Sequence, residues 1–309
     1  MPAKTLSAPV GAPATGLRPV WPLLATLVLL FGASWPVAKL ALATGAATPA
    51  WLAASRSALA CVTLLALLAA LGRLRLPRRR DLPSLLAIGV LQLSGFFALC
   101  HFAVEMVPAG RTAILANAAI VWVVPIAALM GEVVPRRRWL AAVLWLLGIV
   151  TLAGPWAIDW RQGPLVLGHA LLLLAALAWA VAIMVTRLRP PELPALEMLP
   201  WAFALSTVLL VGLALWREPA GGVGPAAWPH ALFNGAVVAP IGTWCLVELS
   251  RRLAPVVSAV LLLIVPAAGV LISAWALNER IGPDLMFGGA LIAAGVVLAA
   301  LTPAAARPA

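Results

Sequence analysis

The chain of 309 residues is 64% hydrophobic and only 10% charged, with a mean hydropathy of +1.06. A soluble domain carries roughly 25% charged residues, so this sequence cannot cover a water-facing surface. Its net charge of +11 would suit a nucleic-acid-binding protein, but the basic residues form short clusters between long apolar segments, which excludes that class. We therefore expect a lipid bilayer around the chain and no nucleic-acid partner.

Apolar segments of about 20 residues, the length that crosses the hydrocarbon core as a helix, follow one another along the whole chain. They are continuously apolar, without the alternation of barrel strands, so helices are favoured. The expected spans are 20–43, 49–71, 82–102, 107–130, 138–156, 164–186, 194–216, 227–247, 254–277 and 284–302. The predicted fold class is an all-α integral membrane protein with ten transmembrane helices.

The distribution of Lys and Arg predicts the orientation. With the N-terminus inside, fifteen of the 21 basic residues fall on the inner loops and tails, and four fall on the outer side. Loops that face the cytoplasm carry such an excess. An odd number of helices would break this alternation, so both termini are expected in the cytoplasm, with the chain in the inner or plasma membrane.

The two halves of the chain share a pattern. Glu132 and Gly148 recur as Glu279 and Gly295, an offset of 147 residues. Because five helices are an odd number, the halves would cross the membrane in opposite senses, as in many secondary carriers. The predicted organisation is a cytoplasmic tail at 1–19, two inverted five-helix repeats at 20–156 and 164–302, and a cytoplasmic tail at 303–309.

Two motifs carry a family resemblance. The first span reads Phe31-Gly-Ala-Ser-Trp35-Pro-Val-Ala-Lys39, and the ninth runs from Pro266 through twelve residues to Glu279-Arg280. In this order and spacing they resemble the EamA family of the drug/metabolite transporter superfamily, whose members carry two five-helix EamA domains. The fourth span departs from the pattern, with Ala119 where the proline would fall and Val133 where the arginine would fall.

The resemblance implies a secondary transporter that moves small metabolites through a central cavity between the halves by alternating access. Such proteins often export amino acids or related compounds. It implies no cofactor, and the three cysteines Cys61, Cys100 and Cys245 lie inside apolar segments without metal-ligand spacing. The sequence leaves the substrate, the coupling ion and the oligomeric state open.

Four basic or titratable side chains lie inside spans, all in the outer half of the bilayer: Lys39, Arg56, His101 and Arg111. A charge at the centre of a membrane helix costs about 2.5–3.5 kcal/mol on insertion scales, and charges that face the bundle interior mark substrate paths. One hypothesis is that the four line an outer vestibule and pair with a carboxylate, either that of Glu105 or that of a substrate. The alternative is that each extends its polar end to the outer headgroups.

Uncharged polar side chains and deep tryptophans are the other candidates for the substrate cavity. The polar ones either line the cavity or form hydrogen bonds between helices. Trp35 and Trp179 lie at similar depths in the helices that open the two halves, where they either present flat apolar walls to a substrate or only pack. The further candidates are Gln92, Asn117, Asn234, Trp244 and Ser258.

Glu132 and Glu279 lie at helix ends, and we interpret them as residues of loop structure rather than proton carriers. Their expected partners are Arg136–Arg138 and Arg280, respectively.

An intramembrane enzyme and a non-transporting membrane subunit remain the alternatives. No His-Glu-x-x-His motif occurs, and Ser94 with His101 is the nearest approach to a Ser/His pair. A sensor or structural subunit would usually carry a soluble domain or long tail, whereas the longest loop here is about a dozen residues.

Overall fold

The structure is a computed structural model, and it describes residues 20–154, 156, 159–253, 257 and 261–302. Within these residues every regular element is a helix, with one isolated β-bridge between Ala47 and Val223. The first half contains α1 (Val20–Ala43), α2 (Pro49–Ala70), η1 (Arg79–Asp81), α3 (Leu82–Leu86), η2 (Ala87–Gly95), α4 (Phe96–Met106), α5 (Ala109–Leu115), α6 (Ala119–Leu129) and α7 (Arg136–Ala153). The second half contains α8 (Gly163–Leu188), α9 (Ala195–Arg217), α10 (Trp228–Leu232), η3 (Phe233–Gly242), α11 (Thr243–Arg252), α13 (Ile264–Leu277) and α14 (Pro283–Ala300).

Seven of these helices are long and apolar enough to cross a membrane. Two of the seven are composite, because η1, α3, η2 and α4 run on as one helix over Arg79–Met106, and α10, η3 and most of α11 as another over Trp228–Leu249. The other three expected spans differ from a simple long helix. The span at 107–130 is split into α5 and α6, α7 begins with three arginines, and the ninth span is described from residue 261 onward.

The third and eighth expected spans both contain a π-helix, η2 and η3. A π-helix is wider than an α-helix and often occurs at functional sites. Each packs through a glycine: a Cβ at Gly89 would lie 3.2 Å from the carbonyl oxygen of Ala202, and a Cβ at Gly235 would lie 2.8 Å from that of Arg56. These two contacts are equivalent at an offset of 146 residues, so the third and eighth spans lie on the seventh and second in the same way.

Helices α7 and α14 also pack on each other through equivalent residues. A Cβ at Gly148 would lie 2.7 Å from the carbonyl oxygen of Gly288, and a Cβ at Gly295 would lie 2.8 Å from that of Ala141. A shift of 147 residues relates Gly148 to Gly295 and Ala141 to Gly288, so it turns each of these two contacts into the other. Small residues let membrane helices approach this closely. The same contact occurs twice with the two helices exchanged, as a two-fold axis would produce.

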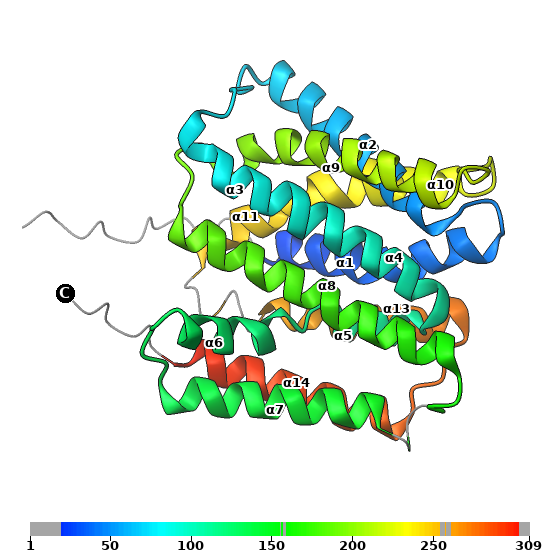
Figure 1. Ribbon diagram of the computed structural model, residues 1–309, viewed down its shortest axis with the longest axis vertical. Coiled ribbons are helices and arrows are strands. Elements are labelled where there is room, and N and C mark those ends of the chain that lie inside the picture. Colours follow the sequence, from blue (N-terminus) through cyan, green and yellow to red (C-terminus); the bar gives the residue numbers. More distant parts are fainter. Residues whose placement is uncertain (1–19, 155, 157–158, 254–256, 258–260, 303–309) are drawn as a thin grey trace, which may run out of the picture.

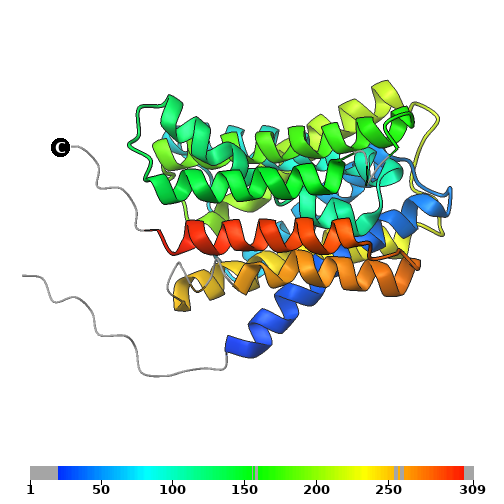
Figure 2. The same cartoon turned by 90° about the horizontal axis from the view of Figure 1, so that it is seen from below.

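The bundle has an arginine-rich end and an opposite end (Figure 1). At the first, loops are joined by ion pairs, including Arg187–Glu132 at 3.1 Å and Arg73–Glu197 at 3.0 Å. At the second, the carboxylate of Glu218 accepts hydrogen bonds from the backbone N–H groups of Ala50 and Trp51. The first turn of α1 and the last turn of α14 lie at the same end of the bundle in both Figure 1 and Figure 2.

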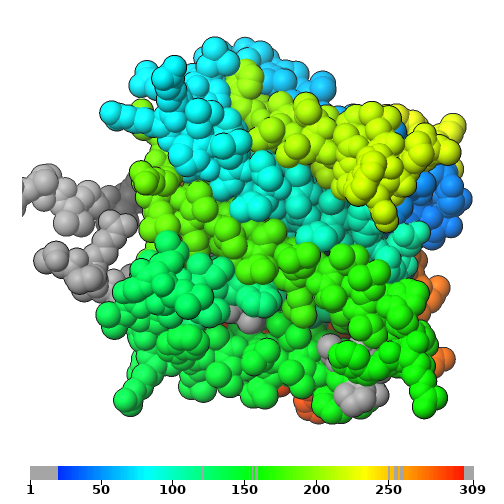
Figure 3. All heavy atoms as spheres, viewed as in Figure 1, coloured from blue at the N-terminus to red at the C-terminus, as the bar shows by residue number. Residues whose placement is uncertain are grey.

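The largest buried cluster runs through the middle of the bundle and joins both halves. It contains Trp35 of α1, Phe97 of α4, Leu172 of α8 and Phe203 of α9. On the face shown in Figure 3, side chains of the third span, in cyan, lie against those of α8, in green. This central region is where the structure places the most deeply buried cation.

Candidate substrate site

Arg56 lies on α2 with only 8% of its surface exposed. Its guanidinium carbon lies 4.4 Å from the ring centre of Phe97 and 6.0 Å from that of Trp35. Its Nε and Nη1 atoms have no hydrogen-bond partner among the described residues, and none of the ion pairs found there includes Arg56. Cation–π contacts contribute about 1–2 kcal/mol, less than the several kcal/mol that burying an unpaired charge costs.

The backbone around Arg56 is held by η3 and α1. Because residue 235 is glycine, η3 can lie against the Arg56 backbone, with a Cβ at that position only 3.2 Å from the Arg56 Cα. The neighbouring Asn234 is 2% exposed and accepts a hydrogen bond from the Ser34 hydroxyl at 2.8 Å. Its amide also donates to the Ser34 carbonyl oxygen at 3.3 Å. Asn234 therefore fixes η3 to α1 next to the arginine.

Aromatic side chains from four helices form a connected cluster, which Arg56 contacts through Trp35 and Phe97. Trp35 and Trp179 both contact Phe96 edge-on, with ring centres 6.1 Å and 4.5 Å away. Phe97 lies 6.4 Å from Phe203 of α9. Trp35 and Trp179, predicted to lie at similar depths, thus both contact one further ring. The three phenylalanines were not predicted, although Phe96 and Phe97 lie about one helical turn before His101.

His101 is fully buried and lies against the same two rings as Arg56, 6.4 Å from Trp35 and 6.2 Å from Phe97 between ring centres. Its Nδ1 is 2.7 Å from the carbonyl oxygen of Phe97, so the proton of a neutral ring lies on Nδ1. Nε2 is then an acceptor, and it has no partner in the described part of the chain. Two unpaired donors of Arg56 and one unpaired acceptor of His101 therefore lie in one aromatic region.

The other two cations of the predicted vestibule bind protein groups instead. The Lys39 ammonium donates to the carbonyl oxygens of Val104, at 3.1 Å, and Val107, at 2.7 Å, where α4 ends. Arg111 forms an ion pair with Asp284 at 2.5 Å and donates to the Leu152 carbonyl oxygen at 3.3 Å. These contacts join helix ends to one another.

Glu105 is exposed, and none of the ion pairs found among the described residues includes it. Glu105, the carboxylate that the sequence suggested as a partner, therefore does not pair with Lys39 or Arg111 in this structure.

Gln92, Asn117 and Trp244 are not among the side chains found in contact with Arg56. Gln92 is half-buried in η2. Asn117 lies in the turn between α5 and α6, where it lines a cavity between α13 and α14. Trp244 is 47% exposed on α11, whereas Cys245 and Leu249 of the same helix are buried against residues of α1; its place in a central cavity stays a prediction. Ser258 lies outside the described residues.

The two family-like glutamates have partners other than those predicted. The Glu279 carboxylate accepts hydrogen bonds from the backbone N–H groups of Ala109, at 2.7 Å, and Gly110, at 2.9 Å, at the start of α5. Glu132 pairs with Arg187 of α8. Both glutamates thus connect one half of the chain to the other, a role that the interpretation as local loop residues missed.

These features define a helical membrane protein with a buried, unneutralised cation between two similar halves. The model of the EamA-like transporter family matches residues 20–154 and 166–301, and the chain belongs to that family, with two EamA repeats. Members of the family are membrane transporters of small molecules.

A comparison with solved structures supports the fold. One of them, titled only "Crystal structure of protein", is 21% identical, with a TM-score of 0.62 over 91% of this chain and 96% of that one. No curated protein matches the chain.

Proposed function

We propose that this protein is a secondary transporter that exports small carboxylate-bearing metabolites, such as amino acids or related compounds, across the inner membrane. The observation that carries the proposal is the buried guanidinium of Arg56, which has two unpaired N–H groups and no acidic partner among the described residues. A carboxylate is the natural complement of a guanidinium, because the two form charge-assisted and often bidentate hydrogen bonds.

The equivalence of the two halves supports a functional rather than a structural role for Arg56. Gly235 approaches Arg56 on α2, and Gly89 approaches Ala202 on α9 in the same way. Ala202 is therefore the residue of the second half that corresponds to Arg56. That position is filled by an alanine that is fully buried. The packing of η3 on α2 therefore does not require a cation, and the cost of burying one is offset if a bound anion completes the site.

His101 suggests which carboxylates would bind. Its unpaired Nε2 accepts a hydrogen bond, so a ligand with an ammonium or hydroxyl group near its carboxylate would pair with both His101 and Arg56. α-Amino acids and α-hydroxy acids have this arrangement. The surrounding rings of Trp35, Phe96 and Trp179 favour an apolar or aromatic side chain on the ligand.

Alternating access is the mechanism that we propose. At the end opposite the arginines, Glu279 of the second half holds the start of α5 in the first half. At the arginine-rich end, Glu132 of the first half pairs with Arg187 of the second. Contacts between the halves at both ends can open by turns, and the equivalent packing of the halves is consistent with two such states. The excess of arginines assigns their end to the cytoplasm.

Transport into proteoliposomes tests the proposal. A panel of labelled amino acids and hydroxy acids is offered to vesicles with and without the protein, and counterflow identifies the substrates. Arg56→Gln should lower flux at subsaturating substrate by at least about tenfold, since hydrogen bonds to a charged group contribute about 1.5–3 kcal/mol. Arg161→Gln, in an exposed loop, is the matched control and should leave flux unchanged.

The alternatives predict other results. A non-transporting membrane subunit would give no flux above empty vesicles for the whole panel. An intramembrane enzyme would convert a substrate rather than move it. In the structure, the Ser94 hydroxyl donates to the Gly89 carbonyl oxygen at 2.6 Å and the Nδ1 of His101 faces Phe97, so these two side chains do not form a nucleophile–base pair.

A further inference from the structure

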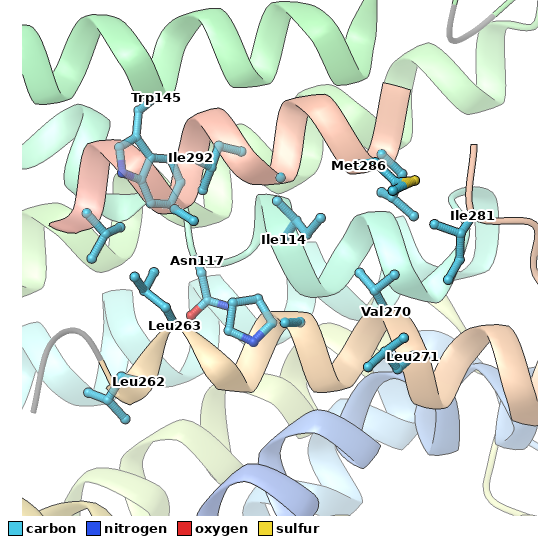
Figure 4. A pocket seen from close by; sticks show the side chains of 16 residues that line it. Ile114, Asn117, Trp145, Leu262, Leu263, Val270, Leu271, Ile281, Met286 and Ile292 are labelled. Atoms are coloured by element: carbon cyan, nitrogen blue, oxygen red, sulfur yellow. The ribbon is translucent and has the colours of Figure 1, made fainter. Parts of the chain in front are cut away.

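A cavity of about 740 Å³ lies between α13 and α14, and Arg56 is not among the residues that line it. Its walls come from four helices and include Ile114 of α5, Trp145 of α7, Val270 of α13 and Ile292 of α14 (Figure 4). Among the described residues that line it, the polar groups are the Asn117 amide, which donates back to the carbonyl oxygen of Ala113 at 2.7 Å, and the indole N–H of Trp145, which has no partner there. Such a wall suits a hydrocarbon ligand, because it offers a polar one almost nothing to bind.

The cavity exists because two consecutive helices pack on different partners. α13 packs on α1 and α5, whereas α14 packs on α7. In the first half, the corresponding helices α6 and α7 do contact each other. The second half therefore has an apolar space between its last two helices that the first half fills with protein.

The cavity opens sideways, toward the lipid. Leu271 of α13 and Met286 of α14 line it and are 63% and 65% exposed. Beside them, Trp275 and Phe287 are 84% and 69% exposed, and α13 and α14 lie on the face of the bundle seen in Figure 2. In a transmembrane protein this face borders the hydrocarbon core, so acyl chains are what the opening meets. Water does not fill such a space, because an apolar cavity stays dry.

The length of the cavity matches one leaflet. Met286 lies at one end and Val296 further along α14. At a rise of about 1.5 Å per residue, these ten residues span about 15 Å. One leaflet supplies half of a hydrocarbon core about 30 Å thick, which is again about 15 Å.

A basic residue lies at the mouth. Arg280 is exposed and directly precedes Ile281, which lies near Met286 at that end of the cavity (Figure 4). No ion pair found among the described residues includes Arg280. This is the membrane end at which Glu279 binds α5, where a lipid phosphate would lie and attract a guanidinium.

From these observations we propose that the cavity binds one phospholipid of the leaflet at this end, with an acyl chain between α13 and α14 and the phosphate at Arg280. The inference is independent of the transported substrate.

Photocrosslinking in proteoliposomes tests it. The probe is a phosphatidylglycerol with a diazirine in the middle of one acyl chain, and the labelled peptides are identified by mass spectrometry. We expect labels on residues that line the interior, such as Ile114, Gly289 and Ile292, and a lipid that remains bound after detergent extraction. Labels confined to the outward-facing Trp275 and Phe287 would overturn the proposal, because these are the contacts of bulk lipid.

Two variants fill the space. Gly289 lines the cavity, with a Cβ there 3.6 Å from Ile114 Cδ1, so Gly289→Phe places a ring inside it; Ala293→Met is a milder second variant. Each should lower interior labelling by about tenfold, since protein then occupies the ligand's volume. The matched control is Gly212→Phe, at an exposed position on α9 with open space around it, which should not change the labelling.

The headgroup is tested separately. Arg280→Gln should weaken retention of the lipid without abolishing interior labelling. A free fatty acid bearing the same diazirine is the competing probe. If it labels the interior and the phospholipid does not, the cavity binds a free amphiphile and the proposal is wrong.

Discussion

Replacing Glu279 by alanine should shift the protein toward the state that is open at the end opposite the arginines. The carboxylate binds two backbone N–H groups, those of Ala109 and Gly110, at the start of α5. Glu279 belongs to the second half and α5 to the first, so opening this end must break the contact. Hydrogen bonds to a charged group contribute about 1.5–3 kcal/mol. A loss of about 2 kcal/mol in total changes the ratio of the two states by about thirtyfold.

Thiol labelling measures this shift. Thr112 is fully buried in α5, close to the bound N–H groups, and the native cysteines among the described residues are all buried. In Thr112→Cys, a membrane-impermeant maleimide added from the Glu279 side should react about thirtyfold faster once Glu279→Ala is present, if the rate follows the open fraction. Glu105→Ala is the control, because Glu105 is an exposed acid of the same region. Equal rates with and without Glu279 would refute the reasoning.

Three further substitutions test other contacts. Gly295→Ala should lower the free energy of unfolding in mixed micelles by about 1–3 kcal/mol relative to Gly212→Ala, which shares the gain in helix propensity but meets open space. Gly235→Ala should push η3 away from α2 and raise the substrate concentration at half-maximal flux, with the amount of protein in the membrane unchanged. Arg187→Gln should favour the state open at the arginine-rich end by only a few-fold, measured by thiol labelling from that side, because its pair with Glu132 is half-exposed and contributes about 1 kcal/mol or less.

Hydrophobicity and length predicted the helical membrane class, and the recurrence of Glu132 and Gly148 at a fixed offset predicted the two repeats, because both signals lie in the linear sequence. The π-helices were not predicted. They occur where Gly89 approaches α9 and Gly235 approaches α2, contacts between residues more than 100 positions apart that the linear sequence does not reveal. The split between α5 and α6 lies at Asn117, a single polar residue whose presence alone does not break a membrane helix.

The candidate site was predicted in part, for a similar reason. Inserting a charge into a bilayer is costly wherever it occurs, so the sequence marks Arg56 and Arg111 equally. What distinguishes them is tertiary structure: Asp284, 173 positions further along the chain, pairs with Arg111, whereas Arg56 has aromatic rings around it. Burial without an acidic partner among the described residues is therefore the feature on which we propose Arg56 as the substrate-binding residue, and only the folded chain displays it.

Binding of a substrate and of its uncharged analogue would test the central claim most directly. Once counterflow has identified a substrate, its affinity is compared with that of its primary amide, for the wild-type protein and for Arg56→Gln. We expect the wild type to prefer the acid by about tenfold or more, since one charge-assisted hydrogen bond contributes at least about 1.4 kcal/mol, and we expect the variant to lose that preference. A variant that still preferred the acid to the same degree would show that Arg56 does not bind the carboxylate.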